Sequence, residues 1–337
     1  MVVEPAAGPG EWRADDVRGN EAWIVRLDEE HRREVLAAVR ATERSTDSRP
    51  TATNRQADPR PAPAADPALD PGSADGFPLP TLGPVLGRVR EELVDGRGFV
   101  LVRGVPVEEM TQREREVAAV GLARHVGEVM PQGPEQAPLM HVRDTGSDPS
   151  EGRTRSYEHR GRLGYHSDPY DVVALLCVRP AKAGGLSAIV SSVAVHNEIV
   201  RLRPDLAEEL YRPWWHDRRT GDGPDSFYTK PICVRRPDGG LSIAYGPDYL
   251  RSAQRGASVP PLTAAQLEVM ALLDELTNDP RFAMTMELQA GDMQFLNNHV
   301  VLHSRTAFED HPEPERRRHL LRLWVTVPRN GTDTTAC

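Results

Sequence analysis

The chain has 337 residues and a formal net charge of −9, with 50 acidic residues against 41 lysines and arginines. This length suits one large domain or two ordinary ones, and the negative charge argues against a nucleic-acid-binding surface, which is normally basic. No apolar run approaches the about 20 residues that span a bilayer, and three scattered cysteines without a CxxC pair fit a reducing compartment. We expect a cytoplasmic protein with neither nucleic-acid nor membrane partners.

The first 42 residues contain one predicted helix. Asp28 is a suitable N-cap, two glutamates follow it, and Val35 and Val39 can share an apolar side. The composition then changes, because the next stretch is rich in Pro, Ala, Asp, Thr and Ser and has almost no large apolar residue to offset the entropy of ordering. We predict an N-terminal helical extension over residues 1–42 and a flexible insertion over residues 43–76.

A folded domain is predicted over residues 77–330. A helix begins near Pro84, and the segment GFVLVR at residues 98–103 is typical of a buried strand. Thr111 with Glu114 forms a capping box that opens a second helix. The domain therefore begins with helices around a strand.

Beyond Met130 the pattern changes to short apolar runs separated by turn signals, which predict strands. These runs are Val172–Val178, Ala188–Val190, Pro231–Val234, Leu241–Tyr245, Met284–Leu288, Met293–Leu296 and His319–Val327. One further helix begins at a second capping box, Thr263 with Gln266. Many short strands with a few outer helices predict a mixed α+β fold with a mainly β core, a β-sandwich or jelly roll.

His166 and Asp168, with one serine between them, are the first candidates for chemistry. On a strand, residues i and i+2 point to the same face, so an imidazole and a carboxylate can reach one metal ion, and this pair suits Fe(II). In a chain with 11 histidines, similar pairs also arise by chance. His196 and Glu198 are one such pair, but they lie in a predicted helix, Ser192–Leu202, where positions i and i+2 are about 200° apart. Geometry therefore favours His166 and Asp168.

Two stretches of the chain resemble the taurine dioxygenase (TauD/TfdA, clavaminate-synthase-like) family. Residues 164–192, GYHSDPYDVVALLCVRPAKAGGLSAIVSS, contain His-x-Asp, a strand, Gly-Gly and a small hydroxyl residue. Residues 291–328, GDMQFLNNHVVLHSRTAFEDHPEPERRRHLLRLWVTVP, contain Gly-Asp, a strand, Asn, Leu-His-x-Arg and an Arg-bearing strand. The resemblance extends over residues 77–328 and implies a double-stranded β-helix (jelly roll) with flanking helices.

The resemblance also implies the site residues. The Fe(II) ligands, which form the catalytic set, match His166, Asp168 and His303. The 2-oxoglutarate-binding residues match Arg318 and Ser187, and Arg322 matches a position near the substrate.

Two of these assignments have rivals in the sequence. His299 lies four residues before His303, which is preferred because it stands in the Leu-His-x-Arg context. Arg318 follows Arg316 and Arg317 directly, so the register of the cosubstrate arginine can shift by one residue.

The last predicted strand gives an argument for an anion site that does not depend on the family resemblance. Leu321, Leu323 and Val325 form one face, and Arg318, Leu320, Arg322 and Trp324 form the other. If the second face points inward, its guanidinium groups need an anion, and their planar fork suits a carboxylate. The other interpretation is a solvated outer face.

The implied activity is oxidation of a small-molecule substrate with Fe(II), O2 and 2-oxoglutarate, which yields succinate and CO2. We expect hydroxylation of an unactivated C–H bond, because Asp168 occupies the position that halogenating relatives leave vacant. A polar substrate, for example a secondary metabolite, is predicted from Arg322 and from Trp214–Arg219, which reads as a substrate lid or as a surface loop anchored by two tryptophans. The alternatives are desaturation or cyclisation on the same scaffold, a metal-dependent hydrolase, and a catalytically silent cupin-like ligand-binding protein.

Overall fold

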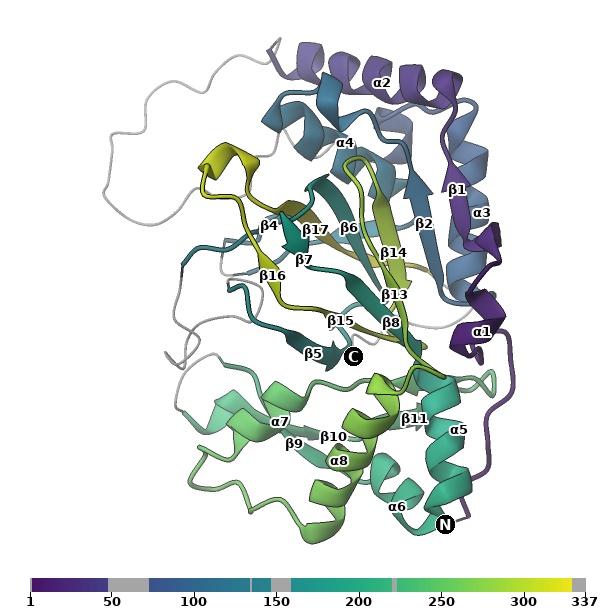
Figure 1. Cartoon of the computed structure of the whole chain (residues 1–337), viewed down its shortest axis with the longest axis vertical. Coiled ribbons are helices and arrows are strands. Elements are labelled where there is room, and N and C mark those ends of the chain that lie inside the picture. The colour runs from purple at the N-terminus through teal and green to yellow at the C-terminus, as the bar shows by residue number, and fades with distance from the viewer. Residues whose placement is uncertain (1, 48–72, 134, 147–158, 220–222, 329–337) are drawn as a thin grey trace.

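The computed structural model describes residues 2–47, 73–133, 135–146, 159–219 and 223–328 (Figure 1). Most of the predicted insertion over residues 43–76 lies outside this description. Of its two ends, the first continues helix α2, Glu29–Asp47, and the second includes a short 3-10 helix, Ala74–Gly76.

Two β-sheets form the centre of the molecule (Figure 1). The larger sheet has the order β1-β2-β14-β6-β17-β3, with β4 also paired to β17, and the smaller has the order β13-β8-β15-β5. The strands of the larger sheet are β1 (Ile24–Arg26), β2 (Phe99–Arg103), β3 (Glu128–Met130), β4 (Met140–Val142), β6 (Val172–Arg179), β14 (Met293–Asn297) and β17 (His319–Thr326); those of the smaller are β5 (Leu163–His166), β8 (Ser187–Ser191), β13 (Met284–Met286) and β15 (Val301–Arg305). This arrangement confirms the predicted jelly roll.

Alternating side chains divide the apolar residues between the interior of the jelly roll and its outer faces. On β8, Ile189 points into the cluster between the two sheets, whereas Val190 joins a cluster on the far face of the smaller sheet. On β17, Leu320 points between the sheets and Leu321 points to the helices outside the larger one. The arginine-bearing face of β17 is therefore the inward face, and the solvated alternative is wrong.

Helices cover both sheets from outside (Figure 1). Apolar residues of α2, α3 and α4 pack on the larger sheet, and those of α5, α6 and α8 pack against the smaller. The predicted capping boxes at Thr111 and Thr263 are both formed. The helices besides α2 are α1 (Ala14–Val17), α3 (Leu82–Val94), α4 (Gln112–Arg124), α5 (Ser192–Leu202), α6 (Pro204–Ala207), α7 (Pro247–Ala253) and α8 (Ala264–Asn278).

Three two-stranded ladders lie beside the main sheets. They are β9 (Trp214–Asp217) with β10 (Phe227–Lys230), β11 (Cys233–Arg235) with β12 (Leu241–Ile243), and β7 (Ala183–Gly184) with β16 (Phe308–Glu309). Short 3-10 helices complete the connections at Glu21–Trp23, Val107–Glu109, Glu208–Tyr211, Pro224–Ser226 and Pro314–Arg316. The predicted Trp214–Arg219 segment is thus a strand followed by a turn, with Trp214 fully buried.

The N-terminal segment is part of the jelly roll rather than only a helical extension. Its strand β1 runs parallel to β2 at the edge of the larger sheet. Trp12 and Trp23 also pack on the ring of Phe99, with ring centroids 5.0 and 5.7 Å away. The predicted boundary at residue 42 therefore does not separate this segment from the domain.

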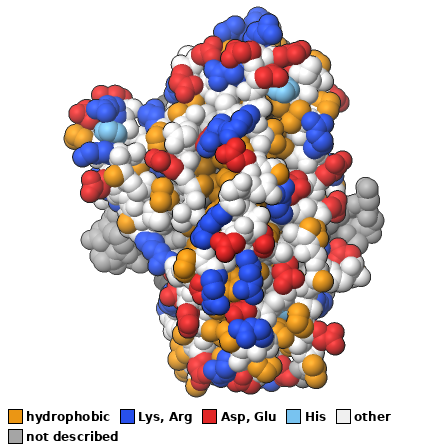
Figure 2. All heavy atoms as spheres, turned by 45° about the vertical axis from the view of Figure 1, so that its right-hand side comes forward, with side chains coloured by type: hydrophobic (Ala, Val, Ile, Leu, Met, Phe, Trp, Pro, Cys, Tyr) orange, Lys and Arg blue, Asp and Glu red, His pale blue; other side chains and the backbone are white. Residues whose placement is uncertain are grey.

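Acidic and basic side chains are intermingled on the face drawn in Figure 2. Within the described residues, no helix combines the length and apolar character that crossing a membrane requires.

A buried ion pair joins β2 to the turn before β14 and gives a stability prediction. Arg103 donates from Nε and Nη2 to the two carboxylate oxygens of Asp292, both at 2.8 Å, and Asp292 is fully buried. Asp292→Ala should lower the free energy of unfolding by about 2–3 kcal/mol, because a guanidinium one-third exposed loses its partner. Urea unfolding of this variant beside Asp205→Ala, which breaks an exposed pair with Arg203, measures the difference. Equal midpoints for the two variants would contradict the expected role.

Candidate metal and cosubstrate site

His303 comes close to His166 and Asp168, although it is far from them in the sequence. His166 ends β5 and lies directly opposite His303 in the register with β15. The potential ligand atoms of the three residues all lie within 4.8 Å of one another, and His303 Nε2 is 3.8 Å from Asp168 Oδ2. Among the described residues, no other group of three His, Cys, Asp or Glu side chains comes together in this way.

Asp168 lies beyond the strand, which differs from the expectation that both early ligands sit on one strand. The strand ends at His166 because the Ser167 N–H donates to the carbonyl of Tyr245 at 2.8 Å and not to a strand partner. The Asp168 N–H donates to Asn298 Oδ1 at 3.0 Å, and the Asn298 amide donates to the carbonyl of Tyr170 at 2.7 Å. Asn298, which the sequence did not single out, therefore fixes the turn that carries the carboxylate.

The two histidines present nitrogen atoms suited to a metal. His166 Nδ1 is 2.9 Å from the carbonyl of Gly164, so Nε2 is the ring nitrogen that remains for a metal ion. Burial, together with His166 and Arg322, lowers the pKa of His303 to about 3, so this imidazole is neutral at physiological pH. A neutral imidazole has the lone pair that a metal ion needs.

Asp168 remains a carboxylate although it is buried. Burial is the largest influence and opposes ionisation, but the charge of Arg322, the strongest favourable influence, helps to hold the pKa of Asp168 below its usual value. Two imidazoles and one carboxylate on one side of a common point form the donor set of non-haem Fe(II) oxygenases. The residues present fit such an ion.

An inner cavity of about 60 Å³ extends from this triad between the sheets. The triad lines one part of it, apolar side chains such as Leu175 and Leu320 line its walls, and Ser187, Arg305 and Arg318 contribute polar groups. These residues come from β5, β6, β8, β15 and β17 or their ends, which explains why they are dispersed in the sequence.

Two buried arginines share this inner cavity. Arg318 and Arg305 are each 6% exposed, and their guanidinium groups lie 5.1 and 4.8 Å from the ring centroid of Phe308. Arg318 Nη1 is buried and has no hydrogen-bond partner among the described residues. Burial, reinforced by Arg318, lowers the pKa of Arg305 to about 10. Two buried cations and an unpaired donor fit a carboxylate ligand.

Arg305 was missed as a site residue, although the sequence contained the signal. It stands two residues after His303 on β15, and positions i and i+2 of a strand share a face. Its Nη2 donates to the carbonyls of His159, at 2.8 Å, and Gly161. Arg305 therefore fixes the segment before β5 and also adds positive charge to the inner cavity.

The Gly-Gly pair of the predicted pattern makes room for Arg318. Gly184 and Gly185 have φ values of +73° and +67°, a conformation that favours glycine. A Cβ on Gly185 would lie 3.2 Å from Arg318 Nε and 3.3 Å from Phe308 Cβ. Ser187 follows on β8, where its hydroxyl donates to Gln294 Oε1 at 2.9 Å. The Ser187 oxygen can still accept a hydrogen bond, so the arginines would be the groups that donate hydrogen bonds to a ligand.

The three consecutive arginines lie in different surroundings. Arg318 lines the inner cavity, whereas Arg317 donates to the carbonyls of His311 and Pro312 at 3.3 and 3.1 Å. Arg316 lies 3.7 Å from Glu313 in an exposed pair.

The two other candidate histidines, His299 and His196, make hydrogen bonds elsewhere and lie outside the triad. The ring nitrogens of His299 lie 2.6 Å from Ser242 Oγ and 2.8 Å from Asp171 Oδ1. His196 lies on the predicted helix and contacts Asn197 and Tyr211 through its two ring nitrogens.

A second space, which we call the mouth, opens on the other side of the triad. It measures about 90 Å³ and is lined by His166, Asp168, Arg322 and Trp324 together with Arg219 and Tyr249. Arg322 Nε donates to Gln132 Oε1 at 3.1 Å, and its guanidinium lies over Trp324 at 4.6 Å. Arg322 lines both the mouth and the inner cavity, so it lies between the two spaces.

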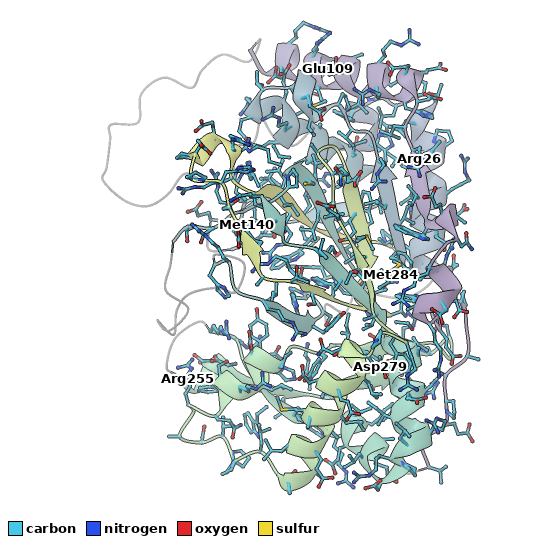
Figure 3. All side chains as sticks on the ribbon, viewed as in Figure 1. Arg26, Glu109, Met140, Arg255, Asp279 and Met284 are labelled. Carbon is cyan, nitrogen blue, oxygen red and sulfur yellow. The ribbon has the colours of Figure 1, made fainter. Side chains whose placement is uncertain are left out.

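Arg219 reaches the mouth from the turn after β9. Its backbone has φ +54°, its N–H donates to Asp217 Oδ1 at 2.8 Å, and its guanidinium lies over Tyr249 at 4.9 Å. Asp217 is buried and accepts hydrogen bonds from Arg255 at 2.8 and 3.0 Å (Arg255 is labelled in Figure 3). The end of the Trp214–Arg219 segment is thus held in place and adds a cation to the mouth.

Known proteins resemble this chain in sequence and in fold. The sequence profile of the family described as "Taurine catabolism dioxygenase TauD, TfdA family" matches residues 63–324. FR-33289 synthase of Streptomyces rubellomurinus (strain ATCC 31215) is 29% identical, over 97% of this chain and 92% of the synthase. A uridine-5'-phosphate dioxygenase of Streptomyces sp is 26% identical, over 71% of this chain and 89% of its own. The solved structure of asparagine oxygenase with Fe(II), 2S,3S-3-hydroxyasparagine and succinate has the same fold, with a TM-score of 0.64 at 18% identity over 90% of this chain and 93% of that one.

Proposed function

The chain belongs to the taurine catabolism dioxygenase TauD, TfdA family and is an Fe(II)- and 2-oxoglutarate-dependent oxygenase; we propose that it hydroxylates an unactivated C–H bond of a small polar molecule that carries an oxyanion group. The observation that supports this proposal best is the pair of arginines, Arg219 and Arg322, beside the triad at the mouth. A catalytically silent binding protein is a poorer account of a complete donor set in a dioxygenase family.

His166, Asp168 and His303 would hold the iron. Their support is the approach of the donor atoms within 4.8 Å, the neutral state of His303 and the ionised state of Asp168. When bound there, iron with 2-oxoglutarate and O2 supplies the oxidant that removes hydrogen from the substrate and yields succinate and CO2. The protein positions the C–H bond and limits water around it.

Arg318 would bind the far carboxylate of 2-oxoglutarate. A guanidinium presents two parallel donors to a carboxylate, and Arg318 Nη1 is a buried donor for which the described residues provide no acceptor. Arg305 adds charge from the next strand, and Ser187 lines the same space. The apolar walls between these groups and the triad suit the methylene carbons of the cosubstrate.

Arg322 and Arg219 would bind the oxyanion of the substrate. Both line the mouth, to which Arg318 does not contribute, so an anion held there would bring the adjoining carbons toward the metal. One similar protein is named a uridine-5'-phosphate dioxygenase, and the family is named for taurine. A phosphate, phosphonate or sulfonate is therefore the chemistry that we propose for this substrate.

Asp168 also favours hydroxylation as the outcome. Its carboxylate is a third protein ligand for the metal, so a halide has no obvious position among the ligands. Desaturation and cyclisation begin with the same hydrogen removal and remain alternatives. Mass analysis after incubation with Fe(II), ascorbate, 2-oxoglutarate and a panel of phosphates, phosphonates, sulfonates and amino acids distinguishes hydroxylation from these alternatives. One oxygen gained from 18O2 supports the proposal, whereas a chlorinated product, or no succinate with any compound, contradicts it.

Replacing the arginines of the mouth should separate substrate binding from cosubstrate binding. Arg322→Ala and Arg219→Ala should each raise the KM for the active compound by about 10–100-fold, which corresponds to the loss of a hydrogen bond to a charged group. The KM for 2-oxoglutarate should change little. Arg317→Ala, whose guanidinium contacts only backbone carbonyls in the described residues, serves as the matched control. A larger effect of Arg322→Ala on 2-oxoglutarate than on substrate would reverse the two roles.

A further inference from the structure

A third space, which we call the side pocket, adjoins the mouth. It measures about 250 Å³ and lies between β5, the start of α7 and the end of α8. None of the metal, cosubstrate or oxyanion roles proposed above uses it. It is larger than the mouth, which measures about 90 Å³.

The mouth and the side pocket have two walls in common. Leu163 and Gly164 of β5 line both spaces on one side, and Pro247 and Asp248 of α7 line both on the other. The mouth and the side pocket therefore adjoin at β5 and α7. Gly164 lies two residues before His166, so their shared wall begins next to the metal site.

The side pocket is polar, but its charges are balanced. Arg251 Nη1 lies 3.8 Å from Asp248 Oδ1, and Arg162 donates to the side chain of Asn278. Asp274 accepts a hydrogen bond from Asn278 at 3.2 Å. The pocket thus has two arginines and two aspartates. At the mouth Asp168 is assigned to the metal, and Asp248, which lines both spaces, lies near Arg251.

Two tyrosines make the side pocket suitable for neutral hydrogen-bonding groups. Tyr165 and Tyr245 both line it, and burial raises the pKa of Tyr165 to about 12, so its hydroxyl stays protonated. A tyrosine hydroxyl donates and accepts hydrogen bonds, and the ring offers an apolar surface beside it. Sugars, amides and heterocyclic bases have this combination of polar edges and flat or apolar faces.

We propose that the substrate has two parts: an oxyanion bound at the mouth and a neutral hydrogen-bonding group, such as a sugar, amide or heterocycle, bound in the side pocket. This inference rests on the proposed function, because it extends the same substrate site. It predicts that a compact anion alone occupies only part of the site. The reacting carbon then lies near the junction of the two parts.

Tyr165 and Tyr245 offer a way to change the side pocket without altering a residue that lines the mouth. Both line the side pocket and neither lines the mouth, and Tyr245 accepts from Ser167 through its backbone carbonyl, which a substitution retains. The double variant Tyr165→Phe, Tyr245→Phe removes the two hydroxyl groups and keeps the rings. Tyr211→Phe, whose hydroxyl contacts His196 and which lines none of the three spaces, is the matched control.

Calorimetric titration of the anaerobic holoenzyme, with Fe(II) and 2-oxoglutarate bound, tests the inference. The probes are methyl phosphate, ribose 5-phosphate, uridine 5'-monophosphate and N-acetylglucosamine 6-phosphate. At least one tailed phosphate should bind about 10-fold more tightly than methyl phosphate, as one or two added hydrogen bonds provide. The double variant Tyr165→Phe, Tyr245→Phe should remove most of this gain and leave methyl phosphate binding unchanged, while Tyr211→Phe should retain both.

The outcomes distinguish this inference from the function on which it rests. If every tailed probe binds no more tightly than methyl phosphate, or if the double variant Tyr165→Phe, Tyr245→Phe weakens all probes equally, the two-part substrate is wrong while the oxyanion site stands. If no phosphate binds, or if Arg322→Ala and Arg219→Ala leave methyl phosphate binding unchanged, the oxyanion site is wrong and the inference fails with it.

Discussion

Replacing His303 with glutamine should weaken Fe(II) binding by at least about 100-fold and remove nearly all succinate formation. Changes to the partners of metal ligands already cost 10–100-fold in metal affinity, so the loss of a ligand should cost no less. The fold should remain intact, because His303 Nδ1 has no hydrogen-bond partner among the described residues and burial disfavours its charged form. Anaerobic calorimetry with Fe(II) and a succinate assay measure the two effects.

The same substitution at His299 provides the control. The ring of His299 lies between Ser242 and Asp171, so His299→Gln should reduce thermal stability and retain Fe(II) binding. Full turnover by His303→Gln, or loss of Fe(II) binding only in His299→Gln, would show that the third ligand is misassigned. Asp168→Ala and His166→Ala should behave like His303→Gln.

Replacing Arg318 with methionine should raise the KM for 2-oxoglutarate by about 30–1000-fold, which corresponds to about 2–4 kcal/mol of lost binding. Methionine retains much of the apolar volume but none of the donors, so the effect isolates the charge-assisted hydrogen bonds. Removing one of two neighbouring buried cations should leave the metal-free protein at least as stable, because Arg305 and Arg318 repel each other. Succinate assays over a range of 2-oxoglutarate concentrations and urea unfolding measure both effects.

Arg317→Met tests the register of this assignment. Arg317 is directed away from the inner cavity to the carbonyls of His311 and Pro312, so its replacement should change the 2-oxoglutarate KM less than about 3-fold, within the range of surface substitutions. An effect of Arg317→Met as large as that of Arg318→Met would move the cosubstrate site by one residue.

Local patterns in the sequence predicted much of the fold because they depend on interactions between residues that are near one another in the chain. The two capping boxes, the helix Ser192–Leu202 and the alternation along β17 follow from the periodicity of side chains and from the hydrogen bonds of helix ends. The triad was found because a family resemblance supplied the long-range pairing of His166 with His303, which no local pattern contains.

The rest depended on contacts between distant segments. Asn298 supports Asp168 across 130 residues, and an asparagine in a turn gives no sign of its partner. The N-terminal strand β1 has three residues, too few for a pattern of alternation to be recognised. The side pocket is formed by β5, α7 and α8, and its existence follows only from their relative positions.

The position of β1 has a consequence for the solubility of the protein. Strand β2 consists of Phe99, Val100, Leu101, Val102 and Arg103, and without β1 one side of it would present unpaired N–H and C=O groups beside apolar side chains. Such an edge is a template for strand pairing between molecules, which leads to aggregation. The three-residue β1 replaces it with a shorter edge that ends in the charged Arg26. We therefore expect the segment before α2 to limit strand pairing between copies of the protein at this edge, although it lies far along the sheet from the candidate metal site.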